Sequence, residues 1–454
     1  MAAGKGTRMK SARPKVLHCL AGKTLLQHVL HAVAPLGAAK TLIVTGHEAA
    51  RVESAVAGPG ISFVRQSPQL GTGHAVQQAV PALGDDGTTL ILNGDVPLIQ
   101  TATAAALVAA CGGQRLALLT IDLADPSGYG RIVRGETRSD GGKSICAIVE
   151  HKDASSAQRE IQEVYTGMLA APTAWLKRAV MALTNDNAQR EYYLTDIVAR
   201  AVADGLAVMA AQPASDTEVL GVNSPVQLAE LERRYQRARA EALMDSSGVR
   251  LADPARFDVR GTLACGSDVE IDVGCVFEGE VVLGDGVSIG AHCVIRDAQI
   301  ESGALIHAFT HIEGAHVGAG ARVGPYARLR PGADLGPEVH IGNFVEVKNS
   351  SLARGAKANH LAYLGDSTVG ERVNFGAGSI TANYDGAHKH RTVIGADVHV
   401  GSNCVLVAPI TLGAGATIGG GSTIAKDAPA GQLTVARAKQ VSLPAWTRPK
   451  KNTP

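Results

Sequence analysis

Short apolar runs alternate with amphipathic segments in the first half of the chain. The segment TLLQHVLHAVAPLG places five apolar residues on one helical face, namely Leu25, Leu26, Val29, Leu30 and Val33. Pro35 and Gly37 end this helix, and the run KTLIVTGH that follows is typical of a strand. GTGHAVQQAVPAL and TTLILNGD repeat the order, and the second strand stops at Gly94 and Asp95. The alternation predicts a parallel sheet with helices on both faces and ligands at the carboxyl ends of its strands.

A longer amphipathic stretch begins near residue 225. In PVQLAELERRYQRARAEALM, apolar side chains recur at helical spacing between charged neighbours. We expect one long connecting helix whose charged face is solvated.

Beyond this helix the hydrophobic pattern has a period of six residues. An aliphatic residue followed by glycine recurs in three groups, which span residues 283–290, 317–342 and 394–419. Within each group the pairs are six residues apart, or a multiple of six. The pairs are Leu283-Gly284, Ile289-Gly290, Val317-Gly318, Val323-Gly324, Leu335-Gly336, Ile341-Gly342, Ile394-Gly395, Val400-Gly401, Leu412-Gly413 and Ile418-Gly419. This repeat predicts a parallel β-helix, because every sixth aliphatic side chain points into a narrow core and the glycine permits a turn. An α-helix, with about 3.6 residues per turn, cannot produce it.

The segment NYDGAHKHRT interrupts the repeat after Asn383. A polar insertion between packed coils is where a solenoid usually carries its function, because the coils themselves vary little. A tolerated surface loop is the alternative interpretation.

Composition narrows the functional classes. A chain of 454 residues is long enough for two or more domains. Its 43 Lys and Arg residues nearly balance 42 Asp and Glu residues, which gives no general argument for binding nucleic acid or an anionic membrane. The sequence has neither a long uncharged apolar run nor a signal-peptide pattern, so we expect a cytoplasmic protein. The seven cysteines are widely scattered and are expected to be buried thiols.

The first half contains groups that suit nucleotide chemistry. The stretch AAGKGTRM, followed by Pro14 and Lys15, combines a glycine loop with the cations Arg8 and Lys15, which suits a triphosphate. A basic turn is the alternative. QLGTGHA offers a second glycine turn for a base or ribose. Asp95 at a strand end is either a ligand of Mg²⁺ or a helix N-cap.

The second half contains a candidate base and two candidate anion-binding cations. His360 lies in ANHLAYLGD, and an imidazole is the usual base when an amine attacks a thioester. Arg330 and Lys348 are long cations among small residues and would bind a sugar phosphate. A role in surface solubility is the alternative for both cations.

These segments together resemble a known family. The motifs PKVLHCLAGK, QLGTGHA, GDVPLI, GYGRI, IVEHKDA, YYLTDI, GVNSP, GPYARLRPG, GNFVEVK and HLAYLGD run through nearly the whole chain. The chain is similar to the bacterial family of bifunctional N-acetylglucosamine-1-phosphate uridyltransferases and glucosamine-1-phosphate acetyltransferases. The resemblance implies an α/β, Rossmann-like nucleotidyltransferase domain (residues 1–225), a linker helix (226–246) and an all-β, left-handed parallel β-helix with acetyltransferase activity (247–454).

The resemblance also implies the two reactions. The β-helix would acetylate glucosamine 1-phosphate with acetyl-CoA. The α/β domain would then join the product to the uridylyl group of UTP, releasing pyrophosphate and giving UDP-N-acetylglucosamine for cell-wall synthesis. Single prisms of this family associate as homotrimers, with the acyl site between neighbours. We expect small-molecule substrates, and neither nucleic acid nor membrane as a partner.

The resemblance assigns residues to the first reaction. The uridine nucleotide and sugar would contact Ala2, Ala3, Gly4, Lys15, Gln66, Gly71, Thr72, Asn93, Gly94, Asp95, Gly130, Glu150, Tyr165 and Asn223. Asp95 and Asn223 would be the protein ligands of Mg²⁺. Arg8 and Lys15 would stabilise the charge that develops on the leaving group.

It also assigns residues to the second reaction. His360 would be the base, and glucosamine 1-phosphate would contact Arg330, Lys348, Tyr363 and Asn374. Acetyl-CoA would contact Ala377, Asn383, Tyr384, Ser402, Gly420 and Arg437.

The sequence departs from the family pattern at two places. The family has an apolar strand before the glycine loop, and here the loop follows the first methionine, so we expect the first strand to be missing. Tyr165 stands where the family commonly has Asn, which replaces a sugar-binding carboxamide with a phenol.

Two other functions fit parts of the sequence. One is a nucleotidyltransferase for another sugar phosphate whose β-helix only assembles the oligomer. The other is a trimeric scaffold without catalysis. A purely structural prism has no need of His360, Lys348 and Arg330 together.

Overall fold

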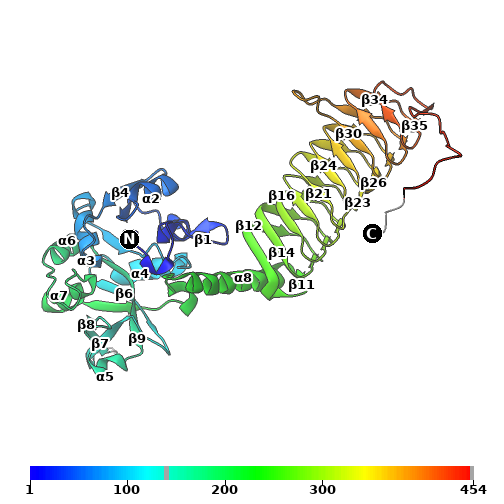
Figure 1. Ribbon diagram of the computed structural model, residues 1–454. Coiled ribbons are helices and arrows are strands. Elements are labelled where there is room, and N and C mark those ends of the chain that lie inside the picture. The colour runs from blue at the N-terminus through cyan, green and yellow to red at the C-terminus, as the bar shows by residue number, and fades with distance from the viewer. Residues whose placement is uncertain (138–142, 450–454) are drawn as a thin grey trace, which may run out of the picture. The chain divides into compact units, whose positions relative to one another are not determined.

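The computed structural model describes residues 1–137 and 143–449, and the chain divides into two compact units, Met1–Tyr235 and Gln236–Pro454 (Figure 1). Helix α8 (Pro225–Ser247) lies in the range expected for the linker helix and contributes to both units. The finer division into residues 1–225, 226–246 and 247–454 stays a prediction.

The main sheet of the first unit is mixed. Its strands run in the order β10, β6, β9, β7 and β8, and β5 also pairs with β9. Their bounds are β5 (Thr88–Ile91), β6 (Leu116–Asp122), β7 (Gly130–Thr137), β8 (Lys143–Val149), β9 (Glu163–Pro172) and β10 (Val208–Ala211). β10 is parallel to β6, but β9 is antiparallel to β5, β6 and β7. The prediction of a parallel sheet is therefore wrong for β9, which follows the antiparallel pair of β7 and β8 instead of a long crossover helix.

Helices cover both faces of this sheet. Their bounds are α1 (Leu25–Val33), α2 (Ala49–Val56), α3 (Thr72–Ala79), α4 (Thr101–Cys111), α5 (Ser156–Arg159), α6 (Thr173–Met181) and α7 (Ile197–Ala203). Along β6, Leu116 and Leu118 pack in one core with α6 and α7, while Ala117 and Leu119 pack in another with α1 and α4. This alternation is the period of two that a strand imposes on its side chains. Thr24 begins α1 with a reciprocal capping box to Gln27.

The first three residues hydrogen bond to both neighbouring sheets. β3 (Thr41–Thr45) and β4 (Ile61–Arg65) form a separate parallel pair, and β1 (Cys19–Leu20) and β2 (Lys23–Thr24) form a small antiparallel pair. The Ala2 N–H donates to Val44 O at 2.8 Å, which joins residues 1–3 to β3. Beyond β5, the Gly94 N–H donates to Met1 O at 2.8 Å. These contacts fix the position of Gly94, and so of Asp95, against the start of the glycine loop.

The second unit is a parallel β-helix (Figure 1). In the described part of the chain, one sheet has 11 strands. They are β11 (Arg250–Leu251), β13 (Glu270–Ile271), β15 (Ser288–Ile289), β17 (Leu305–Ile306), β20 (Arg322–Val323), β23 (His340–Asn343), β26 (Lys357–His360), β29 (Asn374–Phe375), β32 (His399–Val400), β35 (Thr417–Ile418) and β37 (Leu433–Thr434). Each strand pairs in parallel with the next one in this order.

The other strands of the β-helix form one larger sheet. Over the residues described, it holds 16 strands. They are β12 (Phe257–Cys265), β14 (Cys275–Leu283), β16 (Val294–Ile300), β18 (His311–Glu313), β19 (His316–Val317), β21 (Arg328–Leu329), β22 (Ala333–Leu335), β24 (Glu346–Lys348), β25 (Ser350–Leu352), β27 (Tyr363–Gly365), β28 (Ser367–Val369), β30 (Ile380–Ala382), β31 (Thr392–Ile394), β33 (Val405–Val407), β34 (Ile410–Leu412) and β36 (Thr423–Ile424).

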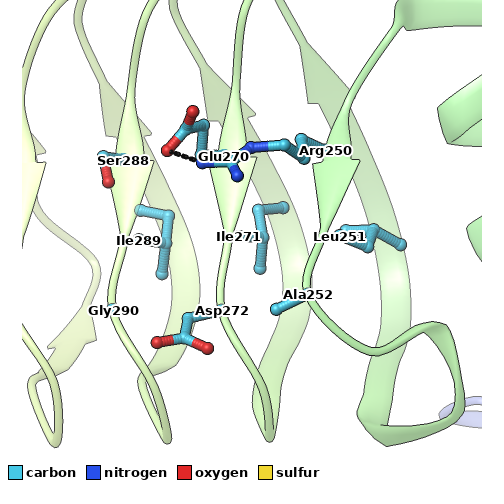
Figure 2. Close-up of a pocket in the computed structure, with 9 residues that line it drawn as sticks. All are labelled: Arg250, Leu251, Ala252, Glu270, Ile271, Asp272, Ser288, Ile289 and Gly290. Carbon is cyan, nitrogen blue, oxygen red and sulfur yellow. Dashed lines mark ion pairs between the residues drawn. The ribbon is translucent and has the colours of Figure 1, made fainter.

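The six-residue pattern marks the core of the β-helix. All ten aliphatic residues of the predicted pairs are at most 3% exposed. Full burial of one such side chain stabilises the fold by about 1.5–3 kcal/mol. Figure 2 shows Ile271 and Ile289 stacked on successive coils beside the Arg250–Glu270 ion pair. The prediction of a parallel β-helix is confirmed.

The glycine after each aliphatic residue serves close packing between coils. A Cβ on Gly342 would lie 1.9 Å from Asn359 O of the next coil. Of these ten glycines only Gly324 has a positive φ, of 97°, and other turns use other positions, such as Leu361 with φ 49°. Side chains on adjacent coils are 17 or 18 residues apart, but the coil that carries the predicted insertion spans 25 residues.

No helix among the residues that the structure describes combines the length and apolar character needed to cross a bilayer.

Candidate functional site

Lys15 joins the two residues expected to bind the metal. It begins a short 3₁₀ helix (Lys15–Leu17), and its Nζ donates to Asp95 Oδ2 and to Asn223 Oδ1, the latter at 3.0 Å. The side chains of Lys15 and Asp95 are 13% and 22% exposed. The Val222 N–H donates to Asp95 O at 2.9 Å, which holds the two loops together. One cation thus lies between two hard oxygen atoms at the edge of the sheet.

The second glycine turn is packed tightly against neighbouring backbone. Gln66 is 4% exposed, and its Nε2 donates to Gly71 O at 2.9 Å and lies 3.2 Å from His74 Nδ1. Gly71 precedes α3 with φ 103°, and a Cβ there would lie 2.7 Å from Tyr192 O. The Thr72 hydroxyl accepts from the Leu194 N–H at 3.1 Å. This close packing positions backbone and amide groups without side-chain motion, which suits recognition of a planar base.

Gly130 and Tyr165 lie on adjacent strands, and Glu150 directly follows the end of β8. Gly130 pairs with Tyr165, and a Cβ on Gly130 would lie 3.8 Å from the Glu150 carboxyl. Burial raises the pKa of Glu150, although Thr195 Oγ1 donates to it at 3.0 Å. Asn93 Nδ2 donates to Gly167 O at 3.3 Å, two residues after Tyr165.

The Tyr165 hydroxyl has no hydrogen-bond partner within the described structure and is buried. The ring packs in a core cluster with Ile132 and Ile148. Burial raises the pKa of the phenol, and the nearby Glu150 carboxyl raises it further. A buried hydroxyl without a partner costs free energy, so this group is poised to accept or donate a hydrogen bond.

In the described structure, no hydrogen bond joins Ala2, Ala3, Gly4 or Arg8 of the glycine loop to the group of Lys15, Asp95 and Asn223. Ala2 and Ala3 are buried, while Gly4 is exposed. Arg8 is exposed and makes no hydrogen bond or ion pair with another residue of the described ranges. The structure therefore brings Lys15, Asp95 and Asn223 together and leaves Arg8 apart.

His360 ends β26 in the second unit. Its Nδ1 lies 2.8 Å from Asn343 Oδ1, one coil earlier. The ring is exposed, and the turn residue Leu361 follows directly. Because the Asn343 oxygen can only accept, this contact places the proton of a neutral ring on Nδ1 and leaves Nε2 as the base.

A polar network lies beyond this turn. Asn383 is 8% exposed, and its Nδ2 donates to Asp366 Oδ2 and, at 3.5 Å, to Tyr363 Oη. Asn349 Nδ2 donates to Asp366 Oδ1 at 2.5 Å. Burial alone would raise the pKa of Asp366, but these two amides, together with nearby cations that include Lys348, lower it overall.

Cations surround this network. The nearby Lys348 ammonium lowers the pKa of Lys389, which lies in the inserted loop. Arg330 Nη1 donates to Glu346 Oε1 at 2.8 Å on the same sheet. The two lysines lie near one another and share one nearby carboxylate, Asp366, which leaves a net positive charge that favours binding of an anion such as a phosphate.

Four predicted residues form a column on successive coils. The Gly378 N–H donates to His360 O, the Asn403 N–H to Ala377 O, and the Gly421 N–H to Ser402 O. His360, Ala377, Ser402 and Gly420 therefore follow one another along the β-helix. Arg437 Nη1 donates to Gly420 O at 2.8 Å at the end of this column. Such a row of small residues can receive an extended ligand.

The remaining predicted residues are divided between the two sheets and the inserted loop. Asn374 is in the sheet of His360, where its Nδ2 lies 3.3 Å from His399 Nε2. Tyr384 is 61% exposed in the inserted loop, and its hydroxyl donates to Gly386 O at 2.6 Å. Lys348 and Tyr363 belong to the larger sheet. Within one chain, the candidate base and the candidate phosphate-binding cations thus lie on different sheets, separated by the turn at Leu361.

Sequence reasoning missed the residues that hold the candidate catalytic groups. Asn343 precedes His360 by 17 residues, and Asn349 and Asp366 were also missed, although they lead at the same interval to Asn383, which was predicted. This interval is one coil, so a search for polar residues repeated at coil spacing would have found them. Gln66 and Glu150 depend on His74 and Thr195, for which the sequence carried no comparable signal.

Two surface pockets lie away from these groups. One, of about 400 Å³, is lined by Asn185, Asp186, Asn187 and Arg190. The other, of about 510 Å³, lies on the first coils of the β-helix (Figure 2). Neither contains a predicted site residue.

Comparison with known proteins agrees with the two-part architecture. Residues 1–123 match the MobA-like NTP transferase domain, and residues 391–426 match the bacterial transferase hexapeptide, in six repeats. Among solved structures, apo UDP-glucose pyrophosphorylase matches 52% of this chain and 97% of its own at 20% identity with a TM-score of 0.42, which is too weak to assign a fold by itself.

Curated relatives match from end to end. The bifunctional protein GlmU of Methylibium petroleiphilum is 75% identical, over 99% of this chain and 98% of its own length. GlmU of Albidiferax ferrireducens is 66% identical, over 99% of both chains. GlmU of Cupriavidus necator is 58% identical, over 99% of this chain and 98% of its own. Identity of this extent covers both units, and the chain therefore belongs to the GlmU family of bifunctional enzymes, with uridyltransferase and acetyltransferase activities in one polypeptide.

Proposed function

We propose that the cluster around Lys15 is the uridyltransferase site. A phosphate oxygen of N-acetylglucosamine 1-phosphate attacks the α-phosphorus of UTP, the bond from this phosphorus to the bridging oxygen breaks, and pyrophosphate leaves. Lys15 and Arg8 neutralise charge on the departing phosphates. The loop from Ala2 to Gly4 contributes backbone groups to the nucleotide, and Gln66, Gly71 and Thr72 hold the uracil.

We propose that the sugar lies over Gly130. Gly130 lies beside the Glu150 carboxyl, and a Cβ there would meet Ile148 Cγ2 at 2.8 Å, so this tightly packed backbone can only form the floor of the sugar site. Asn93 and Tyr165 complete this site, and the unpaired Tyr165 hydroxyl takes the part that a carboxamide plays in relatives. Glu150 accepts a hydrogen bond from a sugar hydroxyl.

The residues present suit Mg²⁺. Asp95 Oδ2 and Asn223 Oδ1 already converge on one cation, the Lys15 ammonium, and carboxylate and amide oxygens are the ligands that Mg²⁺ prefers. When bound, the metal supplies charge neutralisation and orientation of phosphates. Gly94, tied to Met1 by its N–H, keeps Asp95 in place.

For acetyl transfer, we propose His360 as the general base. The amine nitrogen of glucosamine 1-phosphate attacks the thioester carbon of acetyl-CoA, the carbon–sulfur bond breaks, and the proton from nitrogen passes to His360 Nε2. The contact between Asn343 and Nδ1 supports this assignment because it fixes the tautomer. CoA lies along Ala377, Ser402 and Gly420 towards Arg437.

The acceptor is held by the cations of the larger sheet. Lys348, Lys389 and Arg330 bind the phosphate of glucosamine 1-phosphate. Asn383 and Tyr363 orient the reacting groups, and Tyr384 contributes to the CoA side. Asn374 contacts the acceptor from the sheet of His360.

The division of the candidate acyl site between two sheets supports assembly into a homotrimer. One small substrate must reach His360 on one sheet and Lys348 on another, with the turn at Leu361 between them. We propose that a neighbouring prism completes each acyl site, so that the cations of one copy face the base of another.

Phosphorylated sugars and nucleotides do not cross membranes freely, which favours a cytoplasmic location for this protein. Cell fractionation tests this location.

Two assays test the pair of assignments. His360→Ala should lower release of the CoA thiol by about 10²–10⁴-fold and leave pyrophosphate release from UTP unchanged. Asp95→Asn should lower pyrophosphate release from UTP and leave release of the CoA thiol unchanged. Loss of both activities in either variant, or of neither, contradicts the assignment. Light scattering of the native protein tests the trimer.

A further inference from the structure

Lys15 occupies the position between Asp95 and Asn223 where the proposed function puts a divalent cation. Its ammonium is bonded to an oxygen of each residue, and its side chain is only 13% exposed. Mg²⁺ would need the same two oxygen atoms at about 2.0–2.1 Å. An ammonium and a divalent cation cannot both contact this small pair of oxygens, because they repel each other and the space is shared.

The stem of Lys15 also lies against the glycine loop. A Cβ on Gly6 would lie 2.7 Å from Lys15 Cβ, so the loop passes directly over the base of this side chain. The ammonium is therefore tethered between two anionic partners: the Asp95 carboxylate on one side, and any polyphosphate held by the loop on the other. A lysine side chain has the rotatable bonds needed to exchange one for the other.

We propose that Lys15 is an internal competitor for the metal. In the metal-free protein its ammonium keeps the two ligand residues together and excludes a free divalent cation. A nucleotide triphosphate draws the ammonium onto its phosphates and so opens the metal position. This inference rests on the proposed assignment of Asp95 and Asn223. It makes metal affinity depend on the nucleotide, and the dependence is reciprocal because the two binding equilibria are linked.

The test uses Mn²⁺ alone, without nucleotide, and the full-length protein. Binding is measured by the loss of the free Mn²⁺ signal in electron paramagnetic resonance. Lys15→Met should bind one Mn²⁺ about tenfold more tightly than the native protein, because the competing cation is gone. Lys15→Ala serves as a second variant, and retained acetyl transfer with an unchanged melting profile shows that each is folded.

Lys10→Gln is the matched control. Lys10 is an exposed cation of the same segment, so this variant also removes one positive charge, but it leaves the oxygen pair untouched. Its Mn²⁺ affinity should stay within twofold of the native value. An increase in Mn²⁺ affinity equal to that of Lys15→Met would mean that the loss of one positive charge alone explains the effect, and it would overturn the inference.

A double variant separates this inference from the function on which it rests. Lys15→Met combined with Asp95→Asn should lose the gain in Mn²⁺ affinity. If the double variant binds as tightly as Lys15→Met, the metal lies elsewhere and the proposed metal site fails. The competitor role is refuted if both single Lys15 variants bind Mn²⁺ no more tightly than the native protein. In that case, the proposed metal site still stands if Asp95→Asn alone abolishes Mn²⁺ binding in the presence of UTP.

Discussion

Asn343 Oδ1 lies 2.8 Å from Nδ1 of His360, and the two residues pair across adjacent coils of the β-helix. The candidate base is therefore oriented by a side chain 17 residues earlier in the chain. The pairing of Asn343 with His360 is set by the register of the β-helix, because Ile341 and Ala358 pair in the same ladder.

Asn343→Ala should lower kcat for acetyl transfer about tenfold, since losing one hydrogen bond of about 1.5 kcal/mol frees the ring to rotate. The KM values for both substrates should change little, because Asn343 positions the base without touching the substrate. Asn343→Asp keeps an acceptor oxygen at this place and should retain most of the activity. Steady-state thiol release distinguishes the cases, and an equal rise of KM in both variants would contradict a positioning role.

Tyr165→Phe removes a buried hydroxyl that has no partner in the described structure. The KM for N-acetylglucosamine 1-phosphate should rise about fivefold, which corresponds to one hydrogen bond of about 1 kcal/mol. The free energy of unfolding of the first unit should not fall, because an unsatisfied polar group is lost. Pyrophosphate-release kinetics and urea unfolding measure the two effects. An unchanged KM would leave Tyr165 as a packing residue only.

Asp366→Asn tests the pH dependence of the polar network. The pKa of Asp366 is lowered in the folded protein, so its carboxylate stabilises the fold above its ordinary pKa of about 4. This stabilisation is lost as the pH falls through the lowered pKa that Asp366 has in the folded protein. The native protein should thus be more stable than the variant at pH 7, by about 1 kcal/mol, and the difference should vanish in strong acid. Thermal melts of the β-helix between pH 2 and 7 follow it, and a difference that is constant with pH would refute the ionic origin.

Gly342→Ala should destabilise the β-helix by more than about 2 kcal/mol, because the new Cβ would lie 1.9 Å from Asn359 O. Gly286→Ala is the control. There a Cβ meets open space, and only the φ of +66° opposes it, at a cost of about 1–2 kcal/mol. Acetyl transfer should fall with heating in the first variant, while pyrophosphate release should persist. Equal melting temperatures for the two variants would show that the coils have room to separate.

The period of six residues predicted the β-helix well because only this fold buries an aliphatic side chain at every sixth position. An aliphatic side chain such as Ile341 or Val400 can be buried only on the inside of the coil, and both are nearly inaccessible. The direction of β9 was not predictable in the same way. The apolar run from Val164 to Ala171 is buried on both faces, and such a run reads the same whether the strand is parallel or antiparallel.

The candidate sites were predicted residue by residue from the family resemblance, which also placed Asp95 and Asn223 together as ligands of one Mg²⁺, but the contacts of Lys15 with both were not predicted. Lys15, Asp95 and Asn223 lie far apart in sequence, and no pattern near any of them indicates that they meet. The network of Asn349 and Asp366 was hidden because each residue is ordinary in its own coil. It becomes visible only once the coil length of 17 residues is known.

The inserted loop has a consequence for the design of acyltransferases. Its coil spans 25 residues where the one before it spans 17, yet Ser367 and Thr392 remain paired in the ladder. Extra length at this turn is absorbed sideways and is not transmitted along the stack. A loop of another length can therefore replace this one without redesign of the coils beneath it.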